Sequence, residues 1–237
     1  MIGKIAWKNI WRNKVRSAVV IIAIAIGLWA GMFASAFVVG MMNQKIDSVI
    51  NLELSHFQVH HPSFQDEMLP KFVIPNSEEI IQKMNNNEAI KNTSPRVVAM
   101  PMINSANYSG MLKVTGIDPE NEKRVTDLHE FVLEGKYFEG IKRNPILLSK
   151  KTAEKYKIKI RSKVVLTLQD KQGEITAGAF RVVGIYDSKN GMYDEMNAFD
   201  LAPDLQKLLD INHDVHEIAV LLNEHDLAES VATQYQE

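Results

Sequence analysis

Histidines are the residues of this sequence with the clearest potential for chemistry. His56, His60 and His61 lie close together, and imidazole is a common metal ligand. His56 and His60 share one face of an expected strand, but four residues of extended chain separate them by ~13 Å, too far for one metal unless the strand bends. His213 and His216 form a similar pair without a third ligand. We interpret these histidines as solvent-facing or interface residues and predict no metal site.

Other signatures of enzyme chemistry are incomplete. Gly135 and Gly140 have the glycine spacing of a phosphate-binding loop, but Ile141 stands where that loop requires lysine. Tyr108-Ser109-Gly110 lacks the first glycine of a nucleophile elbow. The chain has no cysteine, which excludes disulfides, a thiolate nucleophile and zinc–thiolate sites. We therefore predict no catalytic residue, no cofactor and a non-enzymatic chain.

Length and charge narrow the possibilities further. The 237 residues could form one large domain or two small ones. The net charge of −2 gives no overall basic footprint of the kind that nucleic-acid binding leaves.

An uncharged segment near the N-terminus is the strongest structural signal. No charged residue occurs between Ser17 and Gln44, and residues 18–42 are apolar almost throughout. Since about 20 apolar residues cross the hydrocarbon core of a bilayer, the segment predicts one transmembrane helix over 17–43. Gly27 and Gly31 have the spacing of a close helix–helix contact, although glycine is also simply tolerated in lipid.

A basic segment precedes this helix. Residues 1–16 contain cations but no acid, and at 100° per residue most of the cations share one sector of a helix, opposite Trp7 and Ile10. This pattern predicts a cytoplasmic amphipathic elbow helix over 1–16, lying in the headgroup region. The positive-inside rule then places the remaining domain outside the inner (plasma) membrane. The cations are Lys4, Lys8, Arg12, Lys14 and Arg16.

Two other interpretations of the apolar segment are weaker. Ala34-Ser35-Ala36 satisfies the cleavage rule of a signal peptide, but the apolar run exceeds the usual h-region of about 7–15 residues and continues beyond this site. A buried core helix is disfavoured because the segment has no polar face.

The rest of the chain predicts an α+β domain in which short strands and helices are mixed. Helical spacing continues into an expected stalk over 44–51. Strands are expected over 54–60, 94–104 (interrupted by Pro101), 110–117, 145–149, 163–169, 177–186 and 216–222, and helices over 76–87, 118–128, 150–156, 200–209 and from Leu227 onward.

Five segments, in order and over almost the whole chain, resemble permeases of ABC transporters of the MacB/LolC/FtsX type. They are IAWKNIWRNKVRS at 5–17, SHFQVHHP at 55–62, VTGIDPE at 114–120, LEGKYF at 133–138 and FRVVGIY at 180–186.

The resemblance implies four spanning helices, with a periplasmic core domain between the first and second. That domain, 44–237 here, would have an α/β membrane-proximal part (44–105 and 196–237) and a β-rich insertion (106–195). It also implies a cytoplasmic ATPase on a separate chain, a second permease subunit, contact with membrane lipid, and mechanotransmission that moves a lipoprotein, peptide or drug.

Two features depart from the family pattern. Lipoprotein-releasing members dock a soluble carrier with a long hook, but the corresponding hairpin at 166–180 has only a tight turn over 169–173. Arg161-Ser162 also stands where the family commonly has Gly-Asp.

The leading hypothesis is a permease subunit, with lipoprotein release the favoured cargo class and other export close behind. The alternative is a single-pass sensor or scaffold whose outer domain binds a ligand or partner protein. A membrane-anchored hydrolase is disfavoured for want of a nucleophile or metal set.

Overall fold

The computed structural model describes residues 12, 14–49, 55–106, 108–139, 144–224 and 227–235, with the backbone alone for 43–49. The elbow helix expected over 1–16 lies almost entirely outside these residues. The chain forms two compact units, Met1–Asp47 and Ser48–Glu237.

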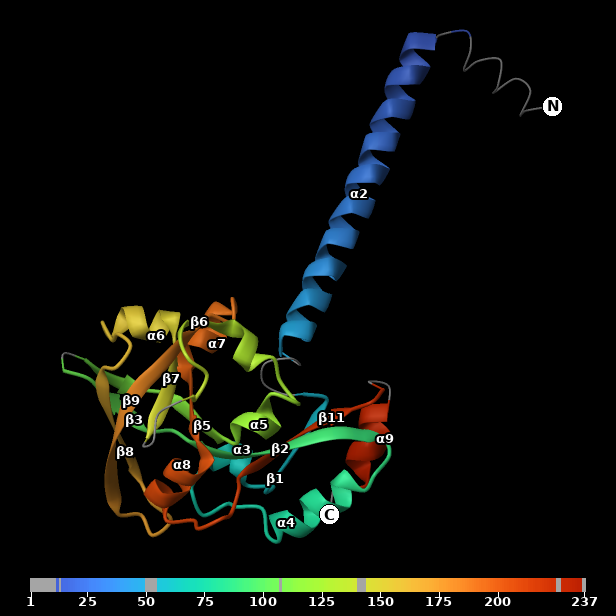
Figure 1. Cartoon of the computed structure of the whole chain (residues 1–237). Helices are drawn as coiled ribbons and strands as arrows, with labels where there is room; N and C mark the ends of the chain where they lie inside the picture. Colours follow the sequence, from blue (N-terminus) through green and yellow to red (C-terminus); the bar gives the residue numbers. More distant parts are fainter. Residues whose placement is uncertain are drawn as a thin grey trace. The chain divides into compact units, whose positions relative to one another are not determined.

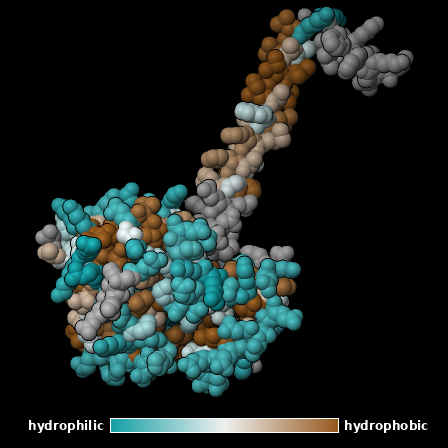
Figure 2. All heavy atoms as spheres, viewed as in Figure 1, coloured by the Kyte–Doolittle hydropathy of each residue, from teal (hydrophilic) through white to brown (hydrophobic). Residues whose placement is uncertain are grey.

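The first unit is dominated by one long helix, α2 (Lys14–Val49), which is drawn in blue in Figure 1. Its apolar side chains are exposed all round, including the stacked rings of Trp29 and Phe33, and Figure 2 shows the hydrophobic colouring along it. Lys14–Met42 is long and apolar enough to cross a membrane. The helix also continues beyond Met42, so the predicted helical extension over 44–51 is confirmed as far as Val49.

The second unit is built on one mixed sheet with the strand order β1-β11-β2-β5-β10-β7-β9-β8-β3-β4, and β6 pairs with β9 beside this path. β5 pairs with β10, and β7 with β9, in parallel; the other pairs are antiparallel. The strands are β1 (Phe57–His60), β2 (Ile90–Ala99), β3 (Met102–Asn104), β4 (Ser109–Met111), β5 (Lys113–Ile117), β6 (Val132–Gly135), β7 (Pro145–Ser149), β8 (Lys163–Gln169), β9 (Ile175–Tyr186), β10 (Asn197–Leu201) and β11 (Glu217–Leu222).

Helices cover both faces of this sheet. Along β7, Ile146 and Leu148 belong to one hydrophobic cluster and Leu147 belongs to the other, as strand alternation requires. The larger cluster takes side chains from α4, α6, α8 and α9, and the smaller one from η2 and α7. The helices are α3 (Phe64–Glu67), α4 (Ser77–Asn85), α5 (Pro119–Glu122), η2 (Leu128–Phe131), α6 (Lys150–Lys155), α7 (Gly191–Met196), α8 (Ala202–Leu209) and α9 (Ala228–Thr233).

The α+β fold class is confirmed, and Pro101 does end a strand. β2 stops at Ala99, and the chain resumes as β3 at Met102. β3 pairs with β8, near the opposite end of the strand order from β2. Both expected parts of the domain contribute strands to this one sheet. The division of 44–237 into a membrane-proximal part and an insertion stays a prediction.

Several predicted boundaries are wrong. The helix expected over 118–128 ends at Glu122 in α5, and a separate turn, η2, begins only at Leu128. The strand expected from residue 94 begins at Ile90, where β2 is already paired with β11.

The helix expected over 200–209 begins at Ala202, because Asn197–Leu201 forms β10 between β5 and β7. Both neighbouring strands are distant in sequence, so local periodicity does not reveal this strand. Pro203 lies in the first turn of α8, where its missing N–H costs no helical hydrogen bond.

Candidate functional site

The predicted histidine pairs do not assemble. His56 accepts a hydrogen bond from the Leu222 backbone N–H to its Nδ1, at 3.0 Å. His61 stacks on Phe72, with 5.1 Å between the ring centroids. His213 is exposed, whereas His216 is fully buried, so the interpretation of His216 as a solvent-facing or interface residue is wrong. Among the residues that the structure describes, no three side chains of histidine, cysteine, aspartate or glutamate are grouped to hold a metal.

His216 has a structural environment that sequence patterns missed. Its Nδ1 accepts from the Val98 N–H at 3.2 Å, and its Nε2 lies 3.1 Å from the Pro70 carbonyl oxygen. This arrangement fits a neutral ring with its proton on Nε2. Burial lowers the pKa of His216 to about 4, because no water remains to solvate an imidazolium.

A buried ion-pair network joins three strands and a helix. Arg96 on β2 bonds to both carboxylate oxygens of Glu122 on α5, and its Nη1 lies 2.8 Å from Oε1 of Glu217 on β11. Gln58 on β1 donates from Nε2 to the same Glu217 oxygen at 2.9 Å. Burial opposes ionisation of Glu122, but the charge of Arg96 and the hydrogen bonds from Arg96, Ser94 and Thr126 together hold the pKa of Glu122 below its usual value. Ser94 and Thr126 also donate to the Glu122 carboxylate.

This network anchors β1, the first described strand of the domain. β1 lies at one edge of the sheet and pairs only with β11 among the described strands. The Gln58–Glu217–Arg96 chain extends that attachment into the interior. The first strand after α2 is therefore held by backbone pairing and by buried charge together.

An apolar groove with a volume of about 700 Å³ runs beside β1. Residues 57–62 line the groove together with side chains of α4 and of the C-terminal end of α9. The Nδ1 atom of His60, in the lining strand, is buried without a partner among the described residues. The groove could accommodate an apolar segment of a ligand or a partner. Its other lining residues are Ile74, Pro75, Ile80, Lys83, Ala232, Gln234 and Tyr235.

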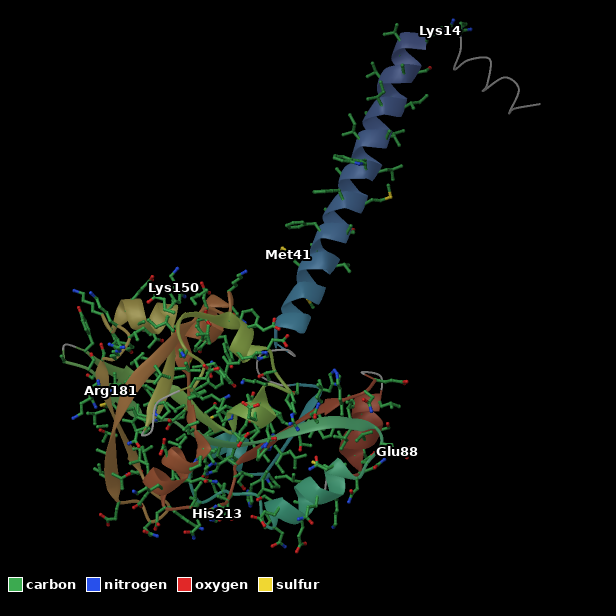
Figure 3. All side chains as sticks on the ribbon, viewed as in Figure 1. Lys14, Met41, Glu88, Lys150, Arg181 and His213 are labelled. Carbon is green, nitrogen blue, oxygen red and sulfur yellow. The ribbon has the colours of Figure 1, made fainter. Side chains whose placement is uncertain are left out.

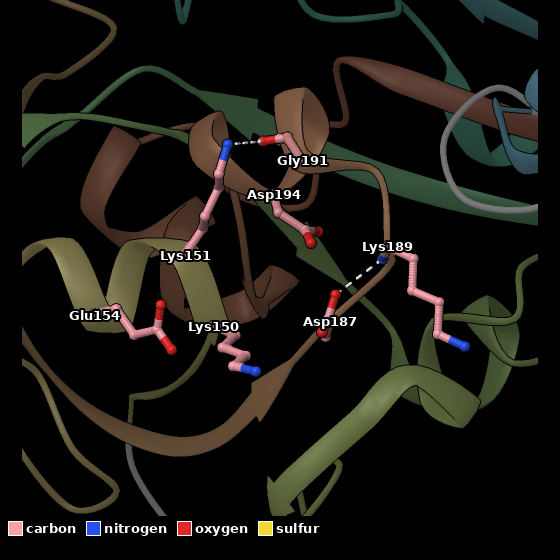
Figure 4. Close-up of a pocket in the computed structure, with 7 residues that line it drawn as sticks. All are labelled: Lys150, Lys151, Glu154, Asp187, Lys189, Gly191 and Asp194. Carbon is pink, nitrogen blue, oxygen red and sulfur yellow. Dashed lines mark hydrogen bonds between the residues drawn. The ribbon is translucent and has the colours of Figure 1, made fainter.

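Figure 4 shows a smaller pocket of about 190 Å³ beside α6 and α7. Lys151 donates to the Gly191 carbonyl at 3.0 Å, and the Lys189 N–H donates to Asp187 at 3.0 Å. The lining contains three lysines and three carboxylates, so their formal charges cancel and do not select an ion. It is lined by Lys150, Lys151, Glu154, Asp187, Lys189, Gly191 and Asp194.

Asp200 is a buried carboxyl group that the sequence did not single out. Its Oδ1 accepts from the Leu201 N–H at 2.7 Å, and its Oδ2 has no partner among the described residues. Burial raises its pKa well above the usual range. Burial thus favours the protonated form of this carboxyl group, and no three potential metal ligands are grouped around it in the described part of the chain.

Gly135 has a packing role that explains its position. It lies at the end of β6 with φ +81°, and a Cβ atom there would lie 2.1 Å from the Val183 carbonyl oxygen. Only glycine tolerates both the backbone angle and this close approach. The glycine spacing from Gly135 thus needs no phosphate ligand to account for it.

Comparison with known proteins identifies the fold. The family model described as the MacB-like periplasmic core domain matches residues 17–237. The crystal structure of the periplasmic region of MacB from Actinobacillus actinomycetemcomitans is 12% identical and superposes with a TM-score of 0.50, covering 75% of this chain and 78% of that chain. The extracellular domain of the noncanonic ABC-type transporter YknZ from Gram-positive bacteria is 18% identical, with a TM-score of 0.49 and coverage of 73% and 86%. No curated protein matches the sequence significantly.

Proposed function

This chain belongs to the family of MacB-like periplasmic core domains, and from that premise we propose that it is a permease subunit of an ABC-type transporter. In this proposal α2 anchors the chain in the inner (plasma) membrane with its N-terminus in the cytoplasm, and the second unit lies on the extracytoplasmic side. The subunit is non-catalytic, and a separate cytoplasmic ATPase supplies the energy. A second permease subunit, identical or not, completes the transporter.

The observation that carries the proposal is the continuity of α2. The membrane-spanning candidate ends at Met42, but the helix continues to Val49 without a break. A helix is stiff over this length because every turn is hydrogen-bonded to the next. A displacement at its basic end can therefore reach its other end, as mechanotransmission requires.

The anchoring of β1 supports the same function. β1 is the first described strand after α2, and it is held through β11 and the Arg96 network. A strand attached in this way moves with the sheet rather than peeling from it. Motion that enters the domain at β1 would then be passed to the domain as a whole.

Lipoprotein release or export of another cargo is the proposed transport class. β8 ends at Gln169 and β9 begins at Ile175, so their connection is short. A hairpin of this length does not support docking of a soluble carrier. We therefore propose that any cargo contact uses the domain itself rather than an extended hook.

The test is to purify the protein from its native membrane in mild detergent and to identify bound chains by mass spectrometry. We expect a small ABC ATPase to co-purify in a fixed ratio. The matched variants reverse charge in the N-terminal basic segment (Lys4→Glu with Lys8→Glu) or in the outer domain (Lys83→Glu with Lys91→Glu). Loss of the ATPase only in the first pair supports the proposal, and absence of any ATPase from the wild-type preparation contradicts it.

A second candidate function is favoured by the groove beside β1, which suits a sensor or scaffold whose outer domain binds a partner. This candidate predicts that an outer-domain ligand is retained and that no ATPase is bound. The same purification separates the two functions.

A further inference from the structure

Besides the basic residues 1–16, cations are concentrated in one short segment of the outer domain, although the chain is weakly acidic overall. Residues 150–163 contain six lysines, one arginine and a single carboxylate, whereas the whole chain has a net charge of −2. The segment comprises α6 and the loop that leads into β8. Outside this segment and residues 1–16, the chain has an excess of carboxylates over cations, so the basic charge of 150–163 is a local feature of the outer domain.

The fold places these cations on the outside. From Lys155 to Lys163, exposed cations alternate with more buried residues, of which Tyr156 and Ile158 are buried in the core. The apolar residues hold the segment against the sheet, and the alternation directs the charges to solvent. We call the exposed set the basic face: Lys155, Lys157, Lys159, Arg161, Lys163 and Arg181.

Arg181 joins this face from the neighbouring strand. It lies directly opposite Lys163 in the β8–β9 register, and its Nη1 donates to the Arg161 carbonyl at 3.1 Å. Like charges opposite each other on a sheet are destabilising. Figure 3 shows Arg181 toward the same end of the domain as Lys150, with Glu88 at the other side of this view.

Most of the basic face has no internal counter-charge. Lys155 pairs with Glu195 at 3.0 Å. Within the described part of the chain, the other five cations make no ion pair. Anions from outside the domain would relieve the repulsion among these five cations.

Aromatic and apolar side chains lie beside the charges. Tyr108, 41% exposed, has the Lys157 ammonium 5.8 Å from its ring centroid. α7, which is joined to α6 through Lys155 and Glu195, carries Met192 at 81% exposure. Cations with an exposed tyrosine and apolar side chains suit the headgroup region of a bilayer, where the charges meet phosphate and the rings lie between polar and apolar layers.

We propose that the basic face binds the anionic phospholipid headgroups of the membrane in which α2 is anchored. Seven helical residues (43–49, about 10 Å) and five further residues (50–54, at most about 17 Å) connect the apolar segment to Ser55. A domain of this size has a radius of gyration of about 16 Å. The bilayer surface is therefore always within reach, at a high effective concentration that an acidic protein in solution does not share. The inference depends on α2 spanning a membrane but not on a transport function.

The experiment places the full chain in nanodiscs of neutral phosphatidylcholine, with or without 30% phosphatidylglycerol. Because the chain has no cysteine, a single dye can be attached at Glu154→Cys, beside the basic face, or at Glu88→Cys as the reference. Lipids carrying a headgroup quencher report docking. We expect quenching at position 154 only in the anionic discs, and its loss in 0.5 M NaCl, because salt screens exposed charges.

Charge-removing variants test the residues themselves. At about fivefold per cation near an anionic surface, Lys157→Gln with Lys159→Gln and Arg161→Gln should lower the ratio of docked to undocked domain on the order of 100-fold. The matched triple Lys83→Gln, Lys91→Gln and Lys207→Gln, exposed lysines elsewhere on the domain, should change it less than twofold. Lys157→Arg with Lys159→Arg should dock normally, which separates lost charge from lost folding.

Equal quenching in neutral and anionic discs overturns the proposal, as does docking that survives the first triple substitution. Absence of quenching at position 154 also overturns it, and that result would point to an acidic protein as the partner of the basic face. None of these outcomes depends on whether an ATPase is bound.

Discussion

The Arg96 guanidinium forms a bidentate pair with the Glu122 carboxylate in the interior of the domain. Nη2 lies 2.7 Å from Oε1 and Nε lies 3.1 Å from Oε2, and both side chains are almost fully buried. Glu217 accepts from the remaining Nη1, so one cation compensates two carboxylates. Buried charges are tolerated only when they are paired and hydrogen-bonded.

Arg96→Met should destabilise the domain strongly. It leaves Glu122 and Glu217 buried without a counter-cation, which costs about 3–5 kcal/mol of unfolding free energy when one partner of a buried pair is removed. The measurement is urea unfolding in mild detergent, followed by far-UV circular dichroism because the three tryptophans all lie at or before position 29. The exposed control Arg124→Met should change stability by less than about 0.5 kcal/mol, and equal effects of the two variants would contradict the structure.

His216 should make stability fall as the pH is lowered. The folded pKa of about 4 lies below the ordinary value of 6.5, so between these values the unfolded chain binds a proton that the folded chain does not. Stability is then fully present above pH 6.5 and is lost toward pH 4, by up to about 3 kcal/mol.

His216→Asn should flatten this part of the pH profile, because the amide does not titrate and its oxygen can still accept from Val98. The exposed His213→Asn should retain the slope. The unfolding free energy of both variants, measured from pH 7.5 to 4, tests whether His216 causes the pH dependence. An unchanged slope in His216→Asn would show that other groups cause it.

Gly135→Ala and Gly173→Ala separate backbone strain from steric collision. Both glycines have positive φ, +81° and +90°, but only the Gly135 Cβ would collide, 2.1 Å from a backbone oxygen, while nothing lies within 4 Å of the Gly173 Cβ. We expect Gly173→Ala to cost about 1 kcal/mol of unfolding free energy, and Gly135→Ala to cost on the order of 1–3 kcal/mol more. Similar costs in a thermal or urea titration would mean that β6 can move away from β9.

Two arginines in the apolar segment should prevent stable membrane insertion. Each arginine at the centre of a spanning helix costs about 2.5–3.5 kcal/mol, so Ile24→Arg with Leu28→Arg should shift the chain from the carbonate-resistant to the extractable fraction. Ile24→Leu with Leu28→Ile is the apolar control and should remain in the membrane. Membrane retention of the arginine variant would contradict a spanning role for α2.

The strands that depend on local pattern were predictable. β7 and β8 have the predicted bounds, 145–149 and 163–169, because alternating or wholly apolar runs end at clear breakers. The wrong start of α8 has the opposite cause. β10 is a strand because it is inserted between β5 and β7, and its buried Asp200 resembles a surface residue in the sequence.

The sequence alone determined that residues 17–44 form an uncharged segment long enough to span a membrane as a helix. A helix in lipid satisfies its own backbone hydrogen bonds, so the composition of about 25 residues is enough to predict it. Only the tertiary structure decided which polar groups are buried. Arg96, Glu122 and Glu217 meet from separate parts of the chain, and His216 is buried in a site where Phe64 stacks on its ring. The basic face depends on both the sequence and the tertiary structure. Its charges are visible in the sequence, but their common exposure, and the approach of Arg181 to Lys163, depend on the pairing of β8 with β9.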